Sequence, residues 1–555
     1  MDEIVLSDTR QPGLLLYQAR EFSIEKHYLN LPVKQGVAKR NVTVIVGGHT
    51  IRTFEIELAD GPPDWWAVLD VRPWHGEKLT LQVDRLPEDS DALKAIEQGD
   101  SIKGARNLYR EALRPQFHFS SRCGWNNDPN GLVFYRGDYH LFYQHNPYGW
   151  NWGNMHWGHA VSKDLVHWAE LGDALAPDEF GPMFSGSAVV DWKNSSGFGK
   201  NGEPPLVLVY TAAGNPTVQC IAYSTDGRTF TKYAGNPVVK QIAGGNRDPK
   251  VIWYEPAHRW VMALYVEMPS TTKDANGRPE ANHTIQFLSS SDLKDWTVMS
   301  QAEDFFECPD FYKLPVEGEA NSGRWVLTAA SSEYELGSFD GTIFTAETPK
   351  LPGHQGDGFY AAQTFSDVPA NDGRRIEMGW LQAPSPGMAF NQAMSLPLEL
   401  KLLSTPDGPR LARLPVKEIE SLRARAYRYG ALSLKPGDDP LARMRGELIE
   451  IRADFEPGDA EEIGFHVRGA SIVYNAKNQE IIVNGRHAPA PLRDGRQRLV
   501  VYLDRTALEV FASDGLTYVP KPFIAKTEDR SVEVFAAGGS ARFRFLEVYE
   551  LKSAW

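Results

Sequence analysis

The chain has 555 residues, of which 42% are hydrophobic and 23% are charged, and its formal net charge at pH 7 is −14. A chain of this length exceeds what one hydrophobic core holds, so we expect about two to four domains. The acidic balance argues against a nucleic-acid partner, and the lack of any apolar run of about 18 residues argues against a membrane-spanning helix.

The first residues, Met1-Asp2-Glu3-Ile4, show neither the basic start nor the apolar run of a secretory signal peptide. We therefore expect a cytoplasmic protein, or a secreted or periplasmic one whose signal peptide has been removed. The sequence does not separate these two locations, and it does not set the oligomeric state.

Residues 1–111 form the first predicted domain. Alternating or β-branched runs predict strands, two of them on either side of a Gly-Gly turn, at residues 42–46, 54–58 and 79–83. Ser90 has the chemistry of a helix N-cap, which predicts a short helix over residues 90–98. We expect a small β-sandwich and interpret its tryptophans as core residues rather than a sugar-stacking face, namely Trp65, Trp66 and Trp74.

Residues 112–408 contain a repeat of long period. A Ser-x-Asp turn followed by an aromatic residue recurs at Asp164, Asp226 and Asp292, with spacings of 62 and 66 residues. Such a recurrence between strand-rich runs is typical of propeller blades with four strands each. The 297 residues of this segment, at a period of about 60, predict a five-bladed β-propeller.

Residues 409–555 differ again. A short helical connector is predicted at residues 416–422, and short alternating strands follow at residues 447–451, 481–483, 498–503, 508–511, 531–535 and 543–545. Regular short strands with turn signals between them predict a C-terminal β-sandwich. The whole chain is therefore expected to be all-β.

Asp128 is the centre of the most informative motif. Pro129 and Gly131 break regular structure directly after it, so residues 125–131 are predicted to be a strand end that turns into a tight loop. An isolated aspartate of this kind is ordinarily part of a surface turn. Apolar flanks, and two later carboxylates in similar Pro-broken settings, favour a functional site here.

Five residues fall one per predicted blade. They are Asp128, Ser185, Asp248, Glu307 and Tyr360, with separations of 57, 63, 59 and 53 residues. Equivalent positions on the innermost strands of a propeller converge on its axis. We therefore expect these side chains to line one central pocket.

Carboxylate pairs carry out glycoside hydrolysis, one as an acid with a raised pKa and the other as a nucleophile or base. Glu307 follows two phenylalanines and precedes Cys308, and such apolar neighbours favour a protonated acid. Asp128, among asparagines, is expected to stay ionised. Arg247 is placed to hold Asp248 ionised and to clamp substrate hydroxyls, with a structural ion pair as the alternative.

Several other groups bear on the site. Three acids are also compatible with a metal, but we favour a reaction without metal or cofactor. The cysteines have no metal or disulfide pattern and are interpreted as packing residues, namely Cys123, Cys220 and Cys308. Amides and aromatic rings at residues 144–147 and 150–159 suit a sugar site. Within that stretch we expect His156 and His159 to pack in a strand, and we favour Trp380 as a pocket floor.

These motifs resemble those of glycoside hydrolase family 32, which contains invertases, inulinases and levanases. Trp-Asn-Asn-Asp-Pro-Asn-Gly, Phe-Ser-Gly-Ser-Ala, Arg-Asp-Pro and Glu-Cys-Pro-Asp occur in the family's order and at its spacing, at residues 125–131, 184–188, 247–249 and 307–310. The resemblance covers residues 112–555. It implies a five-bladed propeller followed by a β-sandwich, and a retaining reaction that releases fructose from β-fructans.

Carried onto this chain, the resemblance implies that Asp128 is the nucleophile, Glu307 the acid/base and Asp248 the stabiliser of the transition state. It implies no metal. The implied substrate contacts are Asn127, Gln144, Trp152, Phe184, Ser185, Arg247 and Trp380.

The chain also departs from the family pattern. Asn126 stands where many members carry Met or Leu, and we expect it to alter the pocket rim. Leu398 replaces an arginine, and we attach no loss of function to this change. Residues 1–111 resemble, more weakly, an extra β-domain of some bacterial fructan-degrading members, which favours levan or inulin over sucrose alone.

Four alternatives stay open on sequence grounds. They are a fructosyltransferase that uses the same site, an endo-levanase, a non-catalytic fructan-binding protein and an inverting propeller glycosidase acting on arabinans. The intact set of three acids disfavours the third, and the motif around Asp128 disfavours the fourth. The sequence does not distinguish β-2,6 from β-2,1 linkages.

Overall fold

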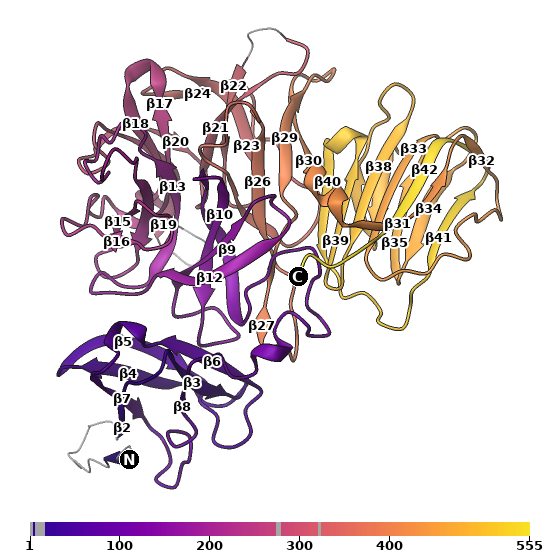
Figure 1. Ribbon diagram of the computed structural model, residues 1–555. Coiled ribbons are helices and arrows are strands. Elements are labelled where there is room, and N and C mark those ends of the chain that lie inside the picture. The colour runs from indigo at the N-terminus through magenta and orange to yellow at the C-terminus, as the bar shows by residue number, and fades with distance from the viewer. Residues whose placement is uncertain (1–3, 6–16, 274–278, 320–322) are drawn as a thin grey trace.

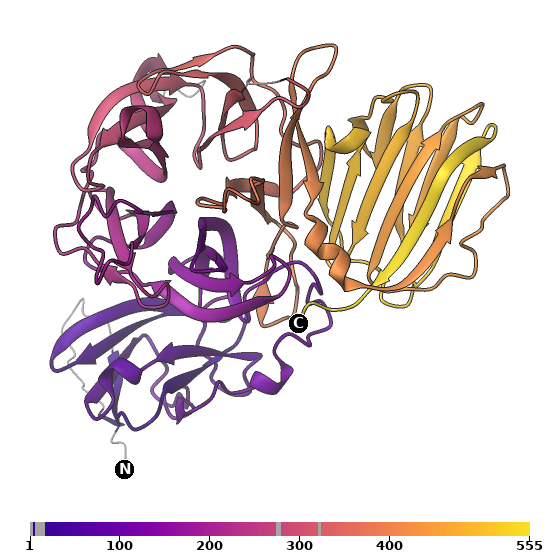
Figure 2. The same ribbon diagram turned by 45° about the horizontal axis from the view of Figure 1, so that its top comes forward.

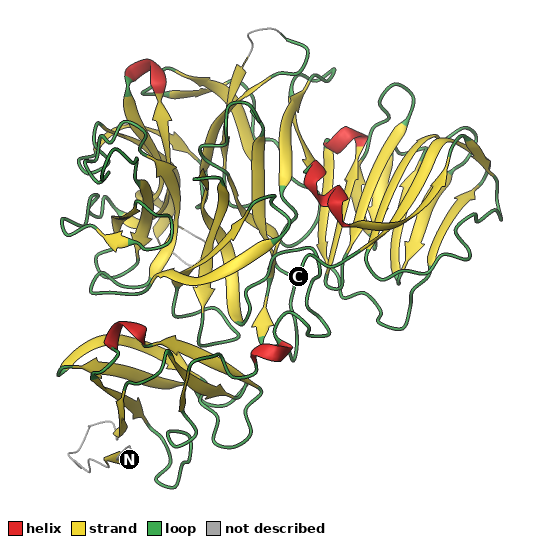
Figure 3. Ribbon diagram, in the orientation of Figure 1, coloured by secondary structure: helices red, strands yellow, loops and turns green. Residues whose placement is uncertain are grey.

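The computed structural model describes residues 4–5, 17–273, 279–319 and 323–555. Figure 1 shows three bodies: a small N-terminal sandwich, a ring of sheets and a C-terminal sandwich beside the ring. Figure 3 shows that strands dominate. Within the described residues the helical elements are short 3-10 turns, η1 (Arg72–Trp74), η2 (Ala105–Asn107), η3 (Glu255–Ala257), η4 (Lys417–Leu422) and η5 (Ser513–Gly515). The predicted all-β class is confirmed.

Two sheets form the N-terminal sandwich. The first has the order β1 (Ile4–Val5), β2 (Tyr17–Ser23), β7 (Lys78–Asp84), β4 (Arg40–Val46) and β5 (His49–Ile56). The second has the order β6 (Trp65–Asp70), β3 (Tyr28–Val33) and β8 (Glu97–Gly99). Alternate side chains of β4 and β6 point into one shared core. Trp65 lies in that core and Trp74 packs against it, whereas Trp66 is partly exposed beneath the Lys103 ammonium.

The helix predicted over residues 90–98 is wrong. Ser90 does accept a hydrogen bond from Ala92 N–H at 3.2 Å, but the segment makes a single turn and then enters β8. Residues 97–99 pair with β3 in the second sheet. Strand pairing, which is a tertiary contact, therefore overrides the local capping signal.

Five sheets form the ring, which Figure 2 shows nearly along its axis. The innermost strands are β9 (Gly124–Tyr135), β13 (Met183–Val190), β17 (Gly244–Tyr254), β21 (Asp310–Pro315) and β25 (Phe359–Thr364). The outer strands of the first three blades are β10 (Asp138–Asn146), β11 (His156–Ser162) and β12 (Trp168–Leu175); β14 (Leu206–Ala212), β15 (Val218–Ser224) and β16 (Thr231–Lys232); and β18 (Arg259–Lys273), β19 (Pro279–Ser290) and β20 (Thr297–Glu303). Those of the last two are β22 (Gly323–Thr328), β23 (Tyr334–Phe339) and β24 (Phe344–Ala346); and β26 (Arg375–Leu381), β29 (Leu398–Leu403) and β30 (Arg410–Pro415), with β28 (Ala393–Met394) beside β26. The predicted five-bladed propeller is confirmed.

The ring is closed by strand pairing between the last blade and the first. β27 (Phe390–Asn391) runs parallel to the start of β9, with Phe390 opposite Gly124. Farther along β9, Val133 forms a bridge with Ser366. Residues that follow the fifth innermost strand therefore hold the strand that contains Asp128.

The repeated Ser-x-Asp motif is a turn at the outer part of three blades. Asp164, Asp226 and Asp292 each accept two backbone N–H hydrogen bonds through Oδ1, at 2.7 to 3.0 Å. Trp168 and Trp296 each donate an indole hydrogen bond to the carbonyl three residues earlier and pack partly buried against the blade cores. The sequence repeat thus marks the return from the third strand to the fourth.

A buried ion pair ties the innermost strands together. Lys250 Nζ of β17 lies 2.9 Å from Asp310 Oδ1 of β21, and both side chains are buried. The same ammonium donates to Thr364 O of β25 at 2.8 Å, and Thr364 N–H donates to Asp310 Oδ2 at 2.6 Å. Three consecutive blades are thereby joined.

The C-terminal body is a sandwich of two sheets, as predicted. One has the order β31 (Arg423–Tyr429), β42 (Ala541–Leu551), β33 (Ile449–Glu456), β38 (Gln497–Leu503), β39 (Ala507–Ala512) and β40 (Thr517–Pro522), with β32 (Leu432–Leu434) beside β42. The other has the order β37 (Arg486–Pro489), β36 (Glu480–Val483), β35 (Ala470–Asn475), β34 (Glu462–Val467) and β41 (Val532–Ala537). The predicted domain boundaries stay predictions, and β30 of the fifth blade lies just beyond residue 408.

His118 lies between the ring and the C-terminal sandwich. Its Nδ1 is 2.9 Å from Asp504 Oδ2 and its Nε2 is 3.0 Å from Glu509 Oε1, and all three side chains are buried. Burial alone would lower the pKa of His118, but the hydrogen bonds and charges of the two carboxylates raise it to about 9. The imidazole is therefore a cation that joins the two bodies.

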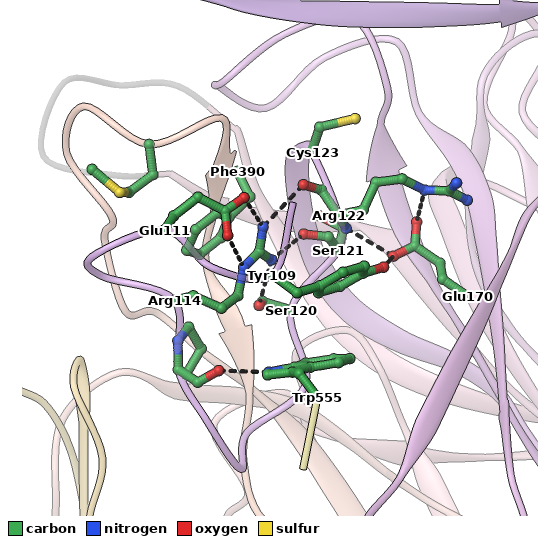
Figure 4. A network of polar contacts seen from close by, with 12 residues as sticks. Tyr109, Glu111, Arg114, Ser120, Ser121, Arg122, Cys123, Glu170, Phe390 and Trp555 are labelled. Carbon is green, nitrogen blue, oxygen red and sulfur yellow. Dashed lines mark hydrogen bonds and ion pairs between the residues drawn. The ribbon is translucent and has the colours of Figure 1, made fainter. Parts of the chain in front are cut away.

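A second junction involves the segment that follows the N-terminal sandwich, as Figure 4 shows. The buried Arg114 guanidinium lies 3.5 Å above the Phe390 ring. Glu170 of β12 accepts a hydrogen bond from Tyr109 OH at 2.9 Å. The Tyr109 ring stacks on Trp555, with centroids 4.6 Å apart. The segment after the N-terminal sandwich, β12, β27 and the last residue of the chain thus meet beside the first blade.

Candidate active site

All ten residues predicted to form the site line one pocket of about 190 Å³ at the ring axis. They are Asn127, Asp128, Gln144, Trp152, Phe184, Ser185, Arg247, Asp248, Glu307 and Trp380, and Tyr360 joins them. The pocket lies at the start of the innermost strands, where each enters the ring. Its volume suits a single sugar unit.

Irregular pairing in the innermost strands turns these side chains toward the pocket. Register shifts interrupt the pairing next to Ser185, around Asp248 and between Tyr360 and Gln363. Such bulges bend a strand and redirect its side chains. Asp248 has φ of 64° and Glu307 has φ of 37°. Non-glycine residues in the left-handed region are uncommon and gather at functional sites.

Asp128 is held through both carboxylate oxygens. Ser185 Oγ donates to Oδ2 at 2.6 Å and Asn127 Nδ2 donates to Oδ1 at 3.1 Å. Burial raises the pKa of Asp128 above its ordinary value, while these hydrogen bonds lower it in part. The sequence predicts that polar neighbours keep Asp128 easily ionised. This prediction is wrong, because burial raises the pKa of Asp128 more than the polar neighbours lower it.

Asp248 lies beside Cys308. Its Oδ2 accepts from Cys308 N–H at 3.1 Å and is 3.3 Å from Cys308 Sγ, which is also 3.5 Å from Asp128 Oδ2. Burial, followed by the negative charge of Glu307, raises the pKa of Asp248 well above its ordinary value, and Arg247 opposes this rise. Arg247 thus acts on Asp248 in the direction predicted, but its Nε is 3.8 Å away.

Glu307 sits among polar partners rather than apolar ones. Tyr360 OH donates to its Oε1 at 2.7 Å and Arg247 Nε donates to its Oε2 at 2.9 Å. Phe305 is buried in the core between blades, and the Phe306 side chain is 41% exposed. The apolar surroundings predicted from the flanking phenylalanines are therefore wrong, because the carboxylate bonds Tyr360 and Arg247, and the Phe306 ring lies 5.7 Å from the Arg247 guanidinium instead.

Arg247 connects the acids to a residue that the sequence did not indicate. Its NH1 lies 3.3 Å from Glu267 Oε1 of β18, and its guanidinium lies 4.6 Å from the Tyr265 ring centroid. Tyr265 OH is 3.2 Å from the same Glu267 oxygen. Glu267 has no local motif, and it reaches Arg247 because β17 and β18 pair in one sheet.

Aromatic rings line part of the pocket. Trp152 is 52% exposed and meets Phe184 edge-to-face with centroids 5.8 Å apart. Trp380 meets Tyr360 edge-to-face at 6.2 Å and donates to Gln392 Oε1 at 3.1 Å. These rings offer apolar faces beside polar groups, which suits the alternating C–H and O–H surfaces of a sugar.

Two other predictions are corrected. Asn126 does not shape the pocket rim, because its side chain is buried and its Oδ1 accepts a hydrogen bond from Ser121 N–H at 3.3 Å. Cys308 is not simple packing, because it faces the carboxylates. Cys123 and Cys220 are buried in hydrophobic cores, as predicted.

The histidines near the site also serve packing. His156 and His159 lie buried in β11, where His159 Nε2 is 3.0 Å from His140 Nδ1.

Among the described residues, no group of three or more His, Cys, Asp or Glu side chains has the arrangement of a metal site. Within the same residues, no helix is long and apolar enough to cross a membrane.

The chain matches two family models along most of its length. Residues 118–415 match "Glycosyl hydrolases family 32 N-terminal domain", and residues 418–550 match "Glycosyl hydrolases family 32 C terminal". The chain is 39% identical to a levanase of Bacillus subtilis over 501 residues, which cover 81% of this chain and 72% of the levanase. It is 30% identical to an extracellular exo-inulinase of Aspergillus ficuum over 531 residues, which cover 80% of this chain and 96% of that one.

Solved structures give the same relationship. The crystal structure of the exo-inulinase from Aspergillus awamori aligns with a TM-score of 0.70 at 28% identity, covering 80% of this chain and 100% of that one. The match to the family begins at residue 118, just before the first innermost strand, β9. The N-terminal sandwich lies outside both family models.

Proposed function

Because the chain belongs to glycosyl hydrolases family 32 and is therefore a glycoside hydrolase, we propose that it releases fructose from β-fructans through a covalent fructosyl-enzyme intermediate. One observation carries the proposal. Asp128, Asp248 and Glu307, from three different blades, converge in one sugar-sized pocket. The similar levanase and exo-inulinases supply the substrate class.

In the first step Asp128 attacks the anomeric C2 of a terminal fructosyl unit. Protonated Glu307 gives its proton to the glycosidic oxygen, the C2–O bond breaks, and the shortened fructan leaves with that proton. Asp128 and C2 are then joined as an ester. Ser185 and Asn127 hold the two carboxylate oxygens of Asp128 and so orient the nucleophile.

In the second step Glu307, now a carboxylate, takes a proton from water. The water oxygen attacks C2, the ester bond breaks, and fructose leaves with its original anomeric configuration while Asp128 is regenerated. Tyr360 and Arg247 hold Glu307 in place for both transfers. An acceptor sugar in place of water would make the same site a fructosyltransferase.

Asp248 is assigned to the fructosyl hydroxyls. Its left-handed backbone and its contacts with Cys308 fix its position, and Arg247 lies next to it. A carboxylate that bonds hydroxyls more strongly as positive charge develops on the ring stabilises the transition state. The pocket's single-sugar volume favours release of one fructose at a time from a chain end over internal cleavage.

The test is a product profile on levan, inulin and sucrose, with the product anomer followed by NMR. We expect fructose as the sole early product from at least one fructan, formed first as the β-anomer. A ladder of oligosaccharides would replace the exo assignment with an endo one. Absence of fructose and of any oligosaccharide from all three substrates would refute the proposed function.

A further inference from the structure

Trp152 reaches the pocket opening on a loop that the N-terminal sandwich touches. The loop spans residues 147–155 between β10 and β11. Its indole is half-exposed beside Phe184. An exposed side chain on a loop keeps one orientation only if the loop itself is held.

Tyr148 is the first anchor, and it is inserted in the core of the N-terminal sandwich. Its ring stacks on Phe54 of β5 with centroids 3.8 Å apart and an interplanar angle of 17°. Arg52 NH1 donates to its hydroxyl at 3.1 Å. The side chain is buried in the core cluster of that sandwich, and its ring also meets His156 of β11 edge-to-face with centroids 5.7 Å apart.

Asn154 is the second anchor, on the other side of Trp152. Its Oδ1 accepts a hydrogen bond from Glu55 N–H at 2.9 Å and its Nδ2 donates to Glu55 O at 2.8 Å. β5 is the edge strand of its sheet, so this side-chain amide takes the place of a neighbouring strand. The two anchors bracket Trp152 in the sequence, and both lead to β5.

The ring supplies its own ties to the same loop. Asn146 Nδ2 donates to Asn151 O at 2.7 Å, and Trp150 Nε1 donates to Phe390 O at 3.0 Å. These contacts fix residues before Trp152. Asn154 is the anchor after it, and that anchor is shared between Asn146 of the ring and the backbone of the N-terminal sandwich.

We infer that the N-terminal sandwich is a positioning element for the sugar site, in which Phe54 and the Glu55 backbone fix Trp152 at the pocket opening. The inference rests on the proposed function. Phe54, Arg52 and Asn154 do not line the pocket, so they act through Trp152. Because an orienting contact of this kind supports the bound sugar in the ground and transition states alike, its loss should raise KM and leave kcat nearly unchanged.

A double-mutant cycle in the full-length protein tests this. The variants are Phe54→Leu, Asn154→Ala, Trp152→Ala and each of the first two combined with Trp152→Ala, assayed for fructose release from a fructan oligosaccharide. We expect Phe54→Leu and Asn154→Ala to raise KM about 3- to 10-fold, the equivalent of one ring contact or hydrogen bond. In the Trp152→Ala background each should change KM by less than about 1.5-fold, because coupled sites are not additive.

Phe22→Leu is the matched control, since Phe22 lies in the same core and its ring does not stack on Tyr148 among the described residues. It should leave KM unchanged at an equal loss of melting temperature. Equal KM effects with and without Trp152 would overturn the inference, as would an unchanged KM in Asn154→Ala. If Phe54→Leu fails to fold, Arg52→Ala, which removes the sandwich's hydrogen bond to the Tyr148 hydroxyl, takes its place in the cycle. Inactive wild-type protein would contradict the proposed function instead.

Discussion

Ser185 Oγ lies 2.6 Å from Asp128 Oδ2, although 57 residues separate the two in the chain. They belong to neighbouring innermost strands, β13 and β9. The hydroxyl donates to a buried carboxylate, so it favours the charged form against the burial that raises the pKa of Asp128. The contact couples the ionisation of the proposed nucleophile to the packing of two blades.

Ser185→Ala should therefore move the acid limb of the activity profile. Without the hydroxyl the pKa of Asp128 rises further, so ionised Asp128 is lost at a higher pH as the pH falls. On that limb kcat/KM should drop roughly 10- to 100-fold, the value of a hydrogen bond to a charged group. The control is Ser187→Ala on the same strand, whose Oγ donates to Pro249 O and which should leave the limb in place. An unshifted limb in Ser185→Ala would contradict the contact's role.

Replacement of the acids separates their two roles. Asp128→Asn and Glu307→Gln should each lower fructose release by about 10²- to 10⁴-fold or more, with unchanged unfolding temperatures. On a fructoside with a good leaving group, Glu307→Gln should recover the first step and show a burst, because no proton is then needed. Asp128→Asn should not recover. Turnover near that of the wild type in either variant would refute the assignment.

The buried Lys250–Asp310 pair predicts a stability effect. Lys250→Met leaves Asp310 unpaired in the ring, which should cost roughly 3 to 5 kcal/mol in the free energy of unfolding. Lys250→Met combined with Asp310→Leu should recover part of the loss. Recovery stays incomplete because Asp310 also accepts hydrogen bonds from Phe311 and Thr364 N–H groups. Urea unfolding of the wild type, Lys250→Met and the double variant measures these free energies. A double variant with a lower free energy of unfolding than Lys250→Met would contradict the prediction.

The contacts of His118 should make the stability of the junction between the ring and the C-terminal sandwich depend on pH. Its folded pKa is raised to about 9, above the ordinary unfolded value of about 6.5. The stabilisation, about 3 kcal/mol, is therefore fully present below pH 6.5 and is lost as the pH rises through 9. His118→Gln should be less stable than wild type at pH 6, and the gap should shrink by pH 9.5. A gap that stays constant across this range would show that His118 is not charged in the folded protein.

The sequence predicted the site because residues at equivalent positions of successive blades recur at a regular spacing, which can be recognised in the sequence. Asp128, Asp248 and Glu307 are far apart in the chain, but their spacing matches one blade, and equal phase places them at the axis. The contacts that surround each of these carboxylates could not be predicted from the sequence. The Glu307 partners come from β17 and β25, the Phe305 ring lies in a core between blades, and the Phe306 ring lies beside Arg247.

The failures have a common cause. Asn126 next to the site motif was assigned to the rim, yet its side chain is buried, because a register shift between Asn126 and Pro129 breaks the regular alternation along β9. The segment after Ser90 has a favourable helix N-cap, yet its last residues pair with the edge of β3 as the strand β8. Glu267 carries no motif at all. Local patterns set each element's tendency, and contacts between distant segments decide the outcome.

The pairing of β27 with β9 also bears on the order of events during synthesis. The strand that bears Asp128 is among the first parts of the ring to leave the ribosome, yet its partner strand emerges 266 residues later, counted from Gly124 to its paired residue Phe390. At the usual rate of about 5 to 20 residues per second, that wait lasts tens of seconds. The nascent chain therefore holds an unclosed ring with no complete sugar pocket, and activity arises only after the fifth blade has been made.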